Sequence, residues 1–507
     1  MILRLHKKDK AIIKNILIWF LALQPFFDLY MSYFDAKILV LGVSVATLLR
    51  LSVVFVLLTL TLISERKRKA TIAFLIYTAL IAVYTILHHY NAIGFTVPLP
   101  FASYSLTNEL FYLVRMFVPV SVIYLVYMVR MRYGDVKKIV LVSSLTFSVV
   151  ICLSNFLKIG YVAYSTDKSI ITDSMLSWFY TGATDIPWWE LSCRGLFQHT
   201  NQLSGVLLIL LPLLCHIALK EKKWYYWIVV FLHLVAMINL STRIATLGGF
   251  AVLIGMLILY GAEALLHRNN RKSKLSTASV IACALCVVFT AVVLLKSPFM
   301  NRFEDGSILS DILNTENFQN NDVEYDNDKT SKETIVMYLE EVLPQMGIQD
   351  MYWKESYPYT EDPSFWYHLI HDVPVSEWSG NRNIRSLLIE RILERDNRLS
   401  NKFLGISHTR SSSFVWPERD IETHLDSLGI AGTILFIGPY FMALLYGIFS
   451  FFKKFLDNLH VEKCCVLFAV ALGLATSYLS GHIMNEILPS LYLALVCGVL
   501  WSASYDK

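Results

Sequence analysis

The chain has 507 residues, of which 55% are hydrophobic and only 17% are charged, with a net charge of +4. This composition excludes an ordinary soluble globular protein and a disordered chain, and it indicates a membrane protein with many spans. Basic residues stand in short clusters between apolar runs, so the small positive charge gives no sign of nucleic-acid binding. Most of the cysteines lie inside apolar runs, which argues against a disulfide framework or a thiolate metal site.

Apolar runs of roughly the length that crosses a bilayer, 17–25 residues, recur along the chain. The first run follows a basic N-terminus but lacks a small-residue cleavage site, so we interpret it as a retained span. We therefore predict an all-α polytopic membrane protein with about twelve transmembrane helices. The expected spans are residues 11–30, 38–62, 71–86, 110–129, 139–156, 203–219, 225–240, 244–262, 277–295, 428–451, 464–479 and 487–501.

Lysine and arginine gather in alternate connections between these runs. The clusters lie at residues 4–14, 66–69, 130–138, 220–223, 268–274 and 453–463. By the positive-inside rule these connections and both termini are cytoplasmic. We therefore divide the chain into residues 1–295 with spans 1–9, an extracytoplasmic loop at 296–427, and residues 428–507 with spans 10–12. Within the loop, apolar residues at helical spacing predict an amphipathic helix at 384–404 that lies over the membrane domain.

Ionisable residues in or beside the spans concentrate on the predicted outer side. A charge at the centre of a membrane helix costs about 2.5–3.5 kcal/mol on insertion scales, so such residues usually face a partner or a wet cavity. A polar cavity open to the outside explains them, and the alternative that Asp28 with Arg50 and Glu109 with Arg115 only pair to hold helices together stays open. The residues are Asp28, Arg50, Glu109, Arg115, Arg194, Arg243 and His482.

Arg194 and Arg243 stand at opposite ends of one predicted helical hairpin, in the sequences RGLFQHTN and LSTRIATLGG. Arginine suits a pyrophosphate because its planar guanidinium donates two hydrogen bonds at once and keeps its charge. Two such cations facing one cleft would hold a phosphate group. We therefore expect both arginines to bind substrate.

The segment WPERDIETHLDSLGIAG precedes the tenth span. With Pro417 in the first turn of a helix, Glu418 and Glu422 share one face, and Asp420 and His424 share a neighbouring one. A carboxylate or imidazole at this position can act as a general base. The alternative reading, that these acids cap the helix and compensate its dipole, stays open.

Two further patterns bear on binding. The aromatic clusters at 178–189 and 351–369 suit either stacking on sugars or an interfacial belt. The pairs His88 with His89 and His368 with His371 lack a third and fourth ligand at metal spacing, so we expect no metal and no cofactor.

In their order, the motifs of the chain resemble those of the O-antigen ligase and polymerase family of membrane glycosyltransferases. The matching segments are GLFQHTN, with Asn201 six residues after the glycine, LSTRIA, GIAG and SGHIMNEILPSLYLAL. The resemblance implies a GT-C type fold and an undecaprenyl pyrophosphate bound by Arg194 and Arg243. One departure is that Arg194 directly precedes its glycine, whereas the ligase arginine stands three residues before it.

The resemblance also implies roles for residues near the tenth span. Eleven residues before the first glycine of GIAG, where ligases carry a histidine, this chain has Glu418, with Asp420 two residues later, which is similar to the Gram-positive polymerase type. These two acids and the two arginines are the expected catalytic residues. The expected substrate-binding residues are Arg194, Arg243, Arg385, Arg115, His199, Asn201, Glu422, His424, His482, Asp28 and Arg50.

By this resemblance the chain is expected to be an inverting, metal-independent polymerase in the cytoplasmic membrane. It would join repeat units carried on undecaprenyl pyrophosphate into a capsular, exo- or O-antigen-like polysaccharide on the outer face, with a flippase and a chain-length regulator as partners besides the lipid bilayer. One alternative is a ligase that transfers the finished glycan to another acceptor. The other is a flippase or transporter, in which charges would be expected to reach both sides of the membrane.

Overall fold

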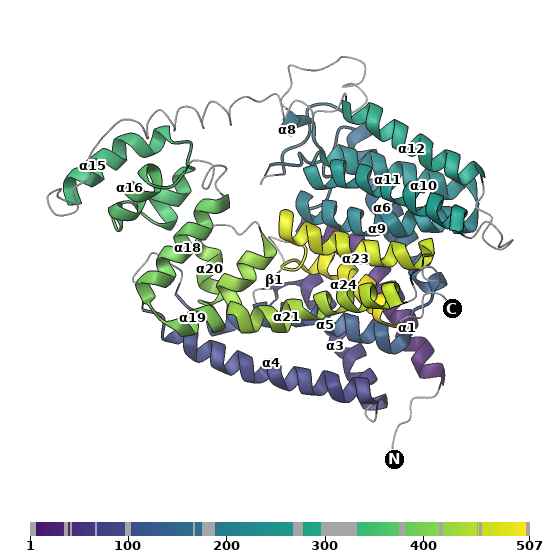
Figure 1. Ribbon diagram of the computed structural model, residues 1–507, viewed down its shortest axis with the longest axis horizontal. Helices are drawn as coiled ribbons and strands as arrows, with labels where there is room; N and C mark the ends of the chain where they lie inside the picture. Colours follow the sequence, from purple (N-terminus) through teal and green to yellow (C-terminus); the bar gives the residue numbers. More distant parts are fainter. Residues whose placement is uncertain are drawn as a thin grey trace. The chain divides into compact units, whose positions relative to one another are not determined.

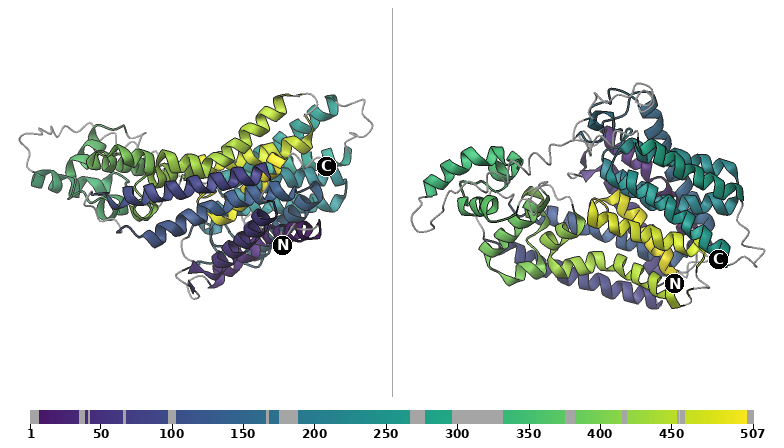
Figure 2. Two further views of the ribbon diagram at one scale, coloured as in Figure 1. Left: turned by 90° about the horizontal axis from the view of Figure 1, so that it is seen from below. Right: turned by 45° about the horizontal axis from the view of Figure 1, so that its top comes forward.

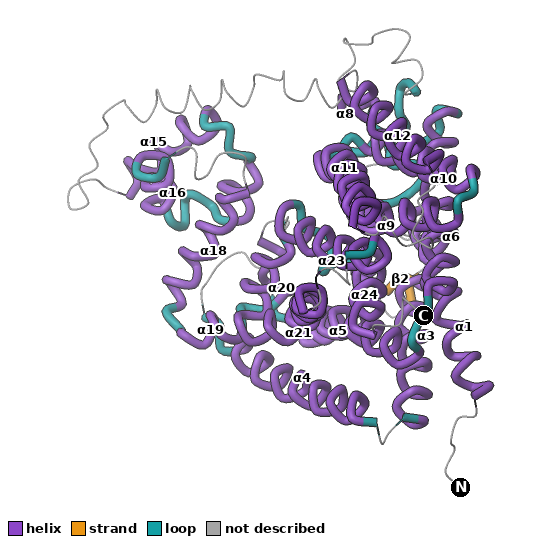
Figure 3. Tube along the Cα trace, turned by 45° about the vertical axis from the view of Figure 1, so that its right-hand side comes forward, coloured by secondary structure: helices purple, strands orange, loops and turns teal. Residues whose placement is uncertain are grey.

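The computed structural model describes residues 7–34, 39–40, 43–65, 68–96, 103–165, 168–174, 188–266, 277–295, 332–374, 382–414, 419–453, 455 and 459–502. Over these residues the chain is almost entirely helical (Figures 1 and 3). The two strands in the described part, β1 (Leu39–Val40) and β2 (Val43–Ser44), form one short antiparallel pair. The predicted all-α class is confirmed.

Each of the twelve predicted spans coincides with a helix. Among the described residues, nine helices are long and apolar enough to cross a membrane, and α1 (Lys7–Ala22) with α2 (Gln24–Phe34) forms a further candidate bent by 48°. Two shorter apolar helices, α10 (Trp224–Leu240) and α24 (Ile487–Ser502), complete the set. The nine are α3 (Val45–Ser64), α4 (Lys69–Ile93), α5 (Leu106–Val129), α6 (Tyr133–Phe156), α9 (Thr200–Glu221), α11 (Arg243–Leu266), α12 (Thr277–Leu295), α21 (Asp420–Lys453) and α23 (Val461–Leu479).

The chain divides into two compact units. Unit 1 comprises Met1–Tyr77, Val114–Arg302 and Phe436–Lys507, and unit 2 comprises Thr78–Leu113 and Phe303–Leu435. Helices α4, α5 and α21 therefore contribute residues to both. The predicted division at residues 295 and 427 stays a prediction.

Helix α9 is the centre of unit 1. It packs against α6, α10, α11, α23 and α24 (Figure 2), and its residues from Gln202 to Leu219 are buried. A helix that is apolar on every side is typical of such an enclosed position. The first turn of α9 is thereby fixed. Asn201 lies in this turn and Arg194 lies shortly before it in the chain, so the packing of α9 also positions these two predicted site residues.

Unit 2 has its own hydrophobic core, built by helices of the large polar segment. Trp353 and Trp366 are only 2% and 0% exposed and lie at its centre. The aromatic cluster at 351–369 is therefore largely core, which corrects both the sugar-stacking and the belt interpretation, while most of 178–189 lies outside the described residues. The helices that contribute to this core are α15 (Lys332–Val342), η2 (Leu343–Gln345), η3 (Met351–Ser356), α16 (Pro363–His371) and α18 (Arg382–Asp396). The helices α19 (Leu399–Leu404) and α20 (His408–Phe414) follow them in the chain.

The predicted amphipathic helix at 384–404 is present as two helices, α18 and α19. Its apolar residues Ile384, Leu388 and Ile392 pack into the core of unit 2. The chain between the helices passes through Asn397, whose φ of 47° ends α18. The buried apolar residues of α18 thus belong to the core of unit 2, whereas Leu399 and Phe403 of α19 are exposed, and the expected position over the membrane domain stays a prediction.

Two glycines let the chain cross α21 at very short range. Gly429 has φ 66° and interrupts the helical conformation of α21, and Gly405 has φ 79°. A Cβ on Gly405 would lie 2.3 Å from the carbonyl oxygen of Ser427, and one on Gly429 would lie 2.4 Å from the carbonyl carbon of Phe403. Only glycine fits both the conformation and the space. The segment Asp420–Leu428 therefore forms a short helix of its own before the break.

Candidate functional site

In unit 1, Arg194 belongs to a small hydrogen-bonded cap formed with residues 160–171. The amide of Tyr161 donates to the Gly195 carbonyl at 2.7 Å, and the amide of Arg194 donates back to the Tyr161 carbonyl at 3.0 Å. Gly195 has φ 68°, and a Cβ there would lie 3.1 Å from Cα of Ile151 in α6. The backbone conformation and the close contact at position 195 therefore favour glycine, and the turn at this residue fixes the position of the Arg194 backbone.

The Arg194 side chain is 6% exposed. Its Nη1 donates to the carbonyl of Ser165 at 2.7 Å, and the guanidinium lies 5.9 Å from the centre of the Tyr161 ring. Burial lowers the pKa of Arg194, while Cys193 and Tyr161 act in the opposite direction. A cation withdrawn from water in this way interacts more strongly with an anion than a solvated one does.

Arg243 is the first residue of α11 and its side chain is exposed. The turn that precedes it is bonded to the Arg194 cap and to the first turns of α9. The bonds are Cys193 N to Asn239 O at 2.7 Å, Tyr164 Oη to Ser241 O at 3.2 Å, and Ser204 Oγ with Thr242 Oγ1 at 2.7 Å. The structure thus brings the backbone segments of the two arginines to one end of the α9, α10 and α11 group, as the hairpin prediction requires.

Three other predicted residues of unit 1 lie near the start of α9. His199 directly precedes the helix and is exposed, and Asn201 is half-buried in its first turn. His482 has a φ of 60° in the turn between α23 and α24. Its neighbour Ile483 contacts α9 so closely that a Cβ on Gly205 would lie 1.9 Å from Ile483 Cδ1.

Arg50 is buried in unit 1 between α2 and α3, with 2% of its surface exposed. Its Nε donates to Gln24 Oε1 at 2.8 Å, and its Nη1 lies 3.1 Å from Met31 Sδ. Asp28, itself 4% exposed, lies within electrostatic range. Gln24 is thus a partner that the sequence did not reveal. Arg115 lies half-buried in α5.

In unit 2, the predicted base residues lie at the start of α21, except Glu418, which lies outside the described residues. Asp420 and His424 are both 1% exposed, and His424 Nδ1 contacts the Asp420 carbonyl at 2.6 Å. Because a carbonyl only accepts, Nδ1 carries a proton in this contact. Glu422 is half-buried and pairs with Arg419 at 2.6 Å.

Arg385 joins three helices of unit 2. From α18 its Nη1 contacts Asp426 Oδ2 of α21 at 2.6 Å, and its Nη2 donates to Ser411 Oγ of α20 at 3.0 Å. The side chain is buried, and an ion pair with a carboxylate already balances its charge. Through these contacts Arg385 links α18 to α20 and α21. Its role in substrate binding stays a prediction.

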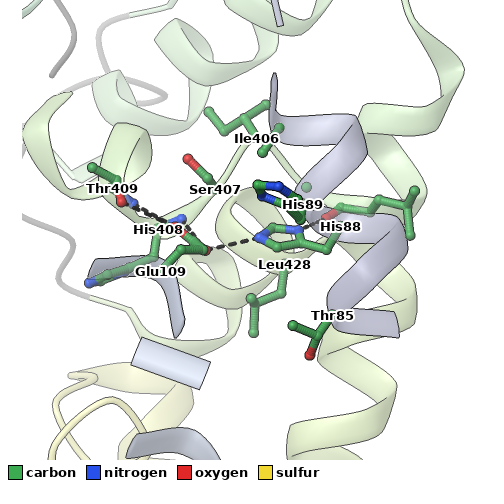
Figure 4. A network of polar contacts seen from close by, with 12 residues as sticks. Thr85, His88, His89, Glu109, Ile406, Ser407, His408, Thr409 and Leu428 are labelled. Carbon is green, nitrogen blue, oxygen red and sulfur yellow. Dashed lines mark hydrogen bonds and ion pairs between the residues drawn. The ribbon is translucent and has the colours of Figure 1, made fainter. Parts of the chain in front are cut away.

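Glu109 organises a polar network that sequence reasoning largely missed (Figure 4). Its Oε1 accepts from His88 Nε2 and from the His408 amide, both at 2.9 Å. Its Oε2 accepts from the amide and hydroxyl of Thr409, both at 3.2 Å. The other imidazole nitrogen of His88 lies 2.5 Å from the Leu404 carbonyl. The sequence marked Glu109 as a charge in a span but gave no sign of these distant partners.

Tyr112, one turn after Glu109 on α5, contacts two imidazoles. Its ring stacks on that of His408 with the centroids 3.6 Å apart and the planes at 4°, and the His424 ring centroid lies 6.4 Å away. Both histidines of this region therefore lie against one tyrosine. His408 was not among the predicted site residues.

Unit 2 also contains a groove of about 630 Å³, within the range of about 300–1,000 Å³ common for small-molecule sites. It runs between α18, the start of α19 and α21. Its polar lining comprises Ser386, Glu390, Glu394, Asn397, Arg398, Lys402, Glu422 and Asp426, and its apolar lining comprises Ile389, Leu393, Leu399, Leu425 and Ile430. Hydroxyl-rich ligands suit such a lining because carboxylates and amides hydrogen-bond hydroxyl groups. Within the described residues, His, Cys, Asp and Glu form no group of three or more that could hold a metal ion.

The spans and the buried charged clusters define a polytopic α-helical membrane protein with polar groups beside its helices. A family model described as O-antigen ligase like membrane protein matches residues 10–503. The chain therefore belongs to this family, and with it to the glycosyltransferase-type enzymes that handle lipid-linked glycans. A search of curated proteins found no significant match.

Proposed function

We propose that this chain polymerises oligosaccharide repeat units carried on undecaprenyl pyrophosphate, on the outer face of the cytoplasmic membrane. Family membership supports the ligase or polymerase kind of transfer in general. The polymerase assignment is supported by Glu418, an acid eleven residues before Gly429 where ligases carry a histidine. Both termini would be cytoplasmic, and a flippase and a chain-length regulator would be its partners.

The observation that carries the proposal is the hydrogen-bonded link between the Arg194 cap and the turn before Arg243. In the reaction an acceptor hydroxyl attacks the anomeric carbon of the donor, and the bond from that carbon to the diphosphate oxygen breaks with inversion. The electron pair leaves with the diphosphate. Two guanidinium groups stabilise this developing charge, which is typically the largest contribution to catalysis.

The proton of the attacking hydroxyl needs an acceptor. Glu418 and Asp420 are the proposed bases, and His424 lies one turn after Asp420, as an imidazole that could take the same role. The groove beside Glu422 and Asp426 is large enough for sugar residues of the acceptor. The remaining predicted binding residues, His199, Asn201, His482, Arg115, Arg50 and Asp28, would contribute to the donor side.

The test is replacement of each arginine. Arg194→Ala and Arg243→Ala should abolish long-chain polymer while the protein stays in the membrane, and Leu247→Ala, an exposed position of α11, serves as a control. Polymer of normal length in either arginine variant would reject the assignment. Mass spectrometry of lipid-linked glycans in a deletion strain separates the alternatives, because short repeats accumulate without a polymerase and long chains accumulate without a ligase.

A further inference from the structure

We infer that Glu109 and His88 are positioning residues for the acceptor side of the proposed transfer. The inference rests on the proposed function and concerns residues that hold the segment Asp420–Leu428. Both nitrogens of His88 face oxygen atoms, the Glu109 carboxylate at 2.9 Å and the Leu404 carbonyl at 2.5 Å. The imidazole therefore bridges the carboxylate on α5 and the backbone at the end of α19.

The contact between His88 and Glu109 links two helix ends. His88 contacts the carbonyl of Leu404, the last residue of α19, and Glu109 accepts from the amides of His408 and Thr409, the first residues of α20 (Figure 4). The turn between the helices is thus fixed at both ends by α4 and α5.

The turn itself adopts a costly conformation. Ser407 has φ 87°, a region that L-residues avoid unless their surroundings impose it, and such strain concentrates at functional sites. The turn is also bonded to the segment Asp420–Leu428, because the amide of Ile406 donates to Asp426 O at 2.9 Å and that of Ser407 to Ser427 O at 3.1 Å. A displacement of the turn should therefore move this segment, which carries Asp420.

Helix α4 holds the break in α21 by a second contact. Tyr84, one turn before His88, donates its hydroxyl to the Leu428 carbonyl at 2.6 Å. That carbonyl lies next to Gly429, where the helical pattern stops. Two polar side chains of α4, Tyr84 and His88, thus contact both segments of the chain that cross at Gly405 and Gly429. Asp420, His424 and the stacked His408 ring depend on this crossing for their positions.

The experiment compares purified variants in lipid nanodiscs, with lipid-linked oligosaccharide extracted from a strain that lacks this chain as substrate. The variants are Glu109→Gln and His88→Gln, and the matched controls are Leu110→Ala and Leu87→Ala, adjacent residues with 42% and 51% of their surface exposed. We expect kcat to fall roughly 10- to 100-fold, since small misplacements of catalytic groups have effects of that size. The donor KM should change less than about twofold. The double variant should lose little more than either single variant, because the two residues act as one pair.

Folded Glu109→Gln and His88→Gln proteins with the kcat of the parent would overturn the inference, and so would a loss confined to the donor KM. If either variant fails to fold, Tyr84→Phe decides, since it removes only the hydroxyl at the break. A fall in kcat with unchanged donor KM supports the inference, and an unchanged kcat overturns it. Failure of the proposed function is seen separately, as normal polymer in Arg194→Ala.

Discussion

The two units hold their charged groups in different ways. In unit 1, Arg194 is fixed mainly by backbone hydrogen bonds of a short cap and by Gly195, whose φ of 68° favours glycine. In unit 2, Glu109 and Arg385 are fixed by side-chain contacts that link separate helices. The difference teaches that the chain can fix a charged residue through its own backbone or through side-chain contacts, and that only the second way also fixes other parts of the chain.

The units also differ in what surrounds these groups. Unit 1 is built around α9, which is apolar on all sides. Unit 2 has a core of aliphatic side chains together with two tryptophans and three tyrosines. Changes in unit 2 should therefore affect stability and activity together, while changes at the arginines of unit 1 should affect activity alone.

The largest effect is expected at the glycine crossing of unit 2. Gly405→Ala and Gly429→Ala each introduce a methyl group within 2.4 Å of backbone atoms at a positive φ that is essentially restricted to glycine, and the conformation alone costs about 1–3 kcal/mol. Protein in the membrane and polymer should both be lost, as measured by immunoblotting and gel analysis of the glycan. Gly261→Ala, with nothing within 4 Å of the added atom, is the control. Wild-type amounts of active Gly429→Ala protein would show that the crossing is dispensable.

Next in size is the replacement of the unit 1 arginines by lysine. Arg194→Lys and Arg243→Lys keep the charge but lose the planar pair of donors, so polymer formation should slow by roughly 10- to 100-fold. Membrane levels should stay unchanged. Arg419→Lys in unit 2, at a partly exposed pair with Glu422, should be close to the parent. Equal effects at all three positions would remove the distinction between the units.

A smaller effect is expected at the ion pair of Arg385. Asp426→Asn leaves a buried guanidinium without its charged partner and should destabilise unit 2 by about 1.5–3 kcal/mol. Thermal unfolding in detergent measures the loss. The double variant Arg385→Met with Asp426→Leu should recover part of it, because replacing both members of a buried pair by apolar residues is often tolerated. A double variant less stable than either single one would argue against a mainly structural pair.

The smallest effect concerns pH and the helical core of unit 2. Burial raises the pKa of Asp362, but hydrogen bonds from Arg391, Tyr357 and Ser364 outweigh it, and the net pKa is lowered. A depressed carboxyl pKa contributes stability above the unfolded value, about pH 4, and that stability is lost as the pH falls through the folded value.

Asp362→Asn should therefore reduce stability at neutral pH by about 1 kcal/mol and should flatten its dependence on pH below 4. Limited proteolysis of the full chain at a series of pH values, with the rate of cleavage within unit 2 as the readout, measures this dependence. An unchanged acid dependence in the variant would assign the effect to other carboxylates.

Much of the fold could be predicted because hydropathy and charge are local signals. A helix lies at each of the twelve predicted spans, although among the described residues only nine helices, or ten with the bent pair, are long and apolar enough to cross a membrane. The four-residue spacing of Asp420 and His424 brings the imidazole of His424 to the backbone carbonyl of Asp420. The common placement of the Arg194 and Arg243 segments also followed from the hairpin. The interruption at Gly429 was not foreseen, since a glycine inside an apolar run does not by itself reveal a left-handed residue.

The network around Glu109 could not be predicted for a different reason. Its partner His408 lies 299 residues away along the chain, and one sequence contains no signal that links such positions. The aromatic segment at 351–369 was misread because a core of tryptophan and tyrosine has the same composition as a membrane belt. Only the packing distinguishes the two.

Because α9 is enclosed by other helices, its packing can be completed only after those helices have inserted into the membrane. Helices α23 and α24, which pack on α9, come long after it in the chain and are therefore synthesised later. Until they insert, lipid acyl chains would have to cover the faces of α9 that they later occupy, and acyl chains are as apolar as leucine. A chain truncated before residue 461 should insert normally, but it would lack α23 and α24, the helices that pack against α9.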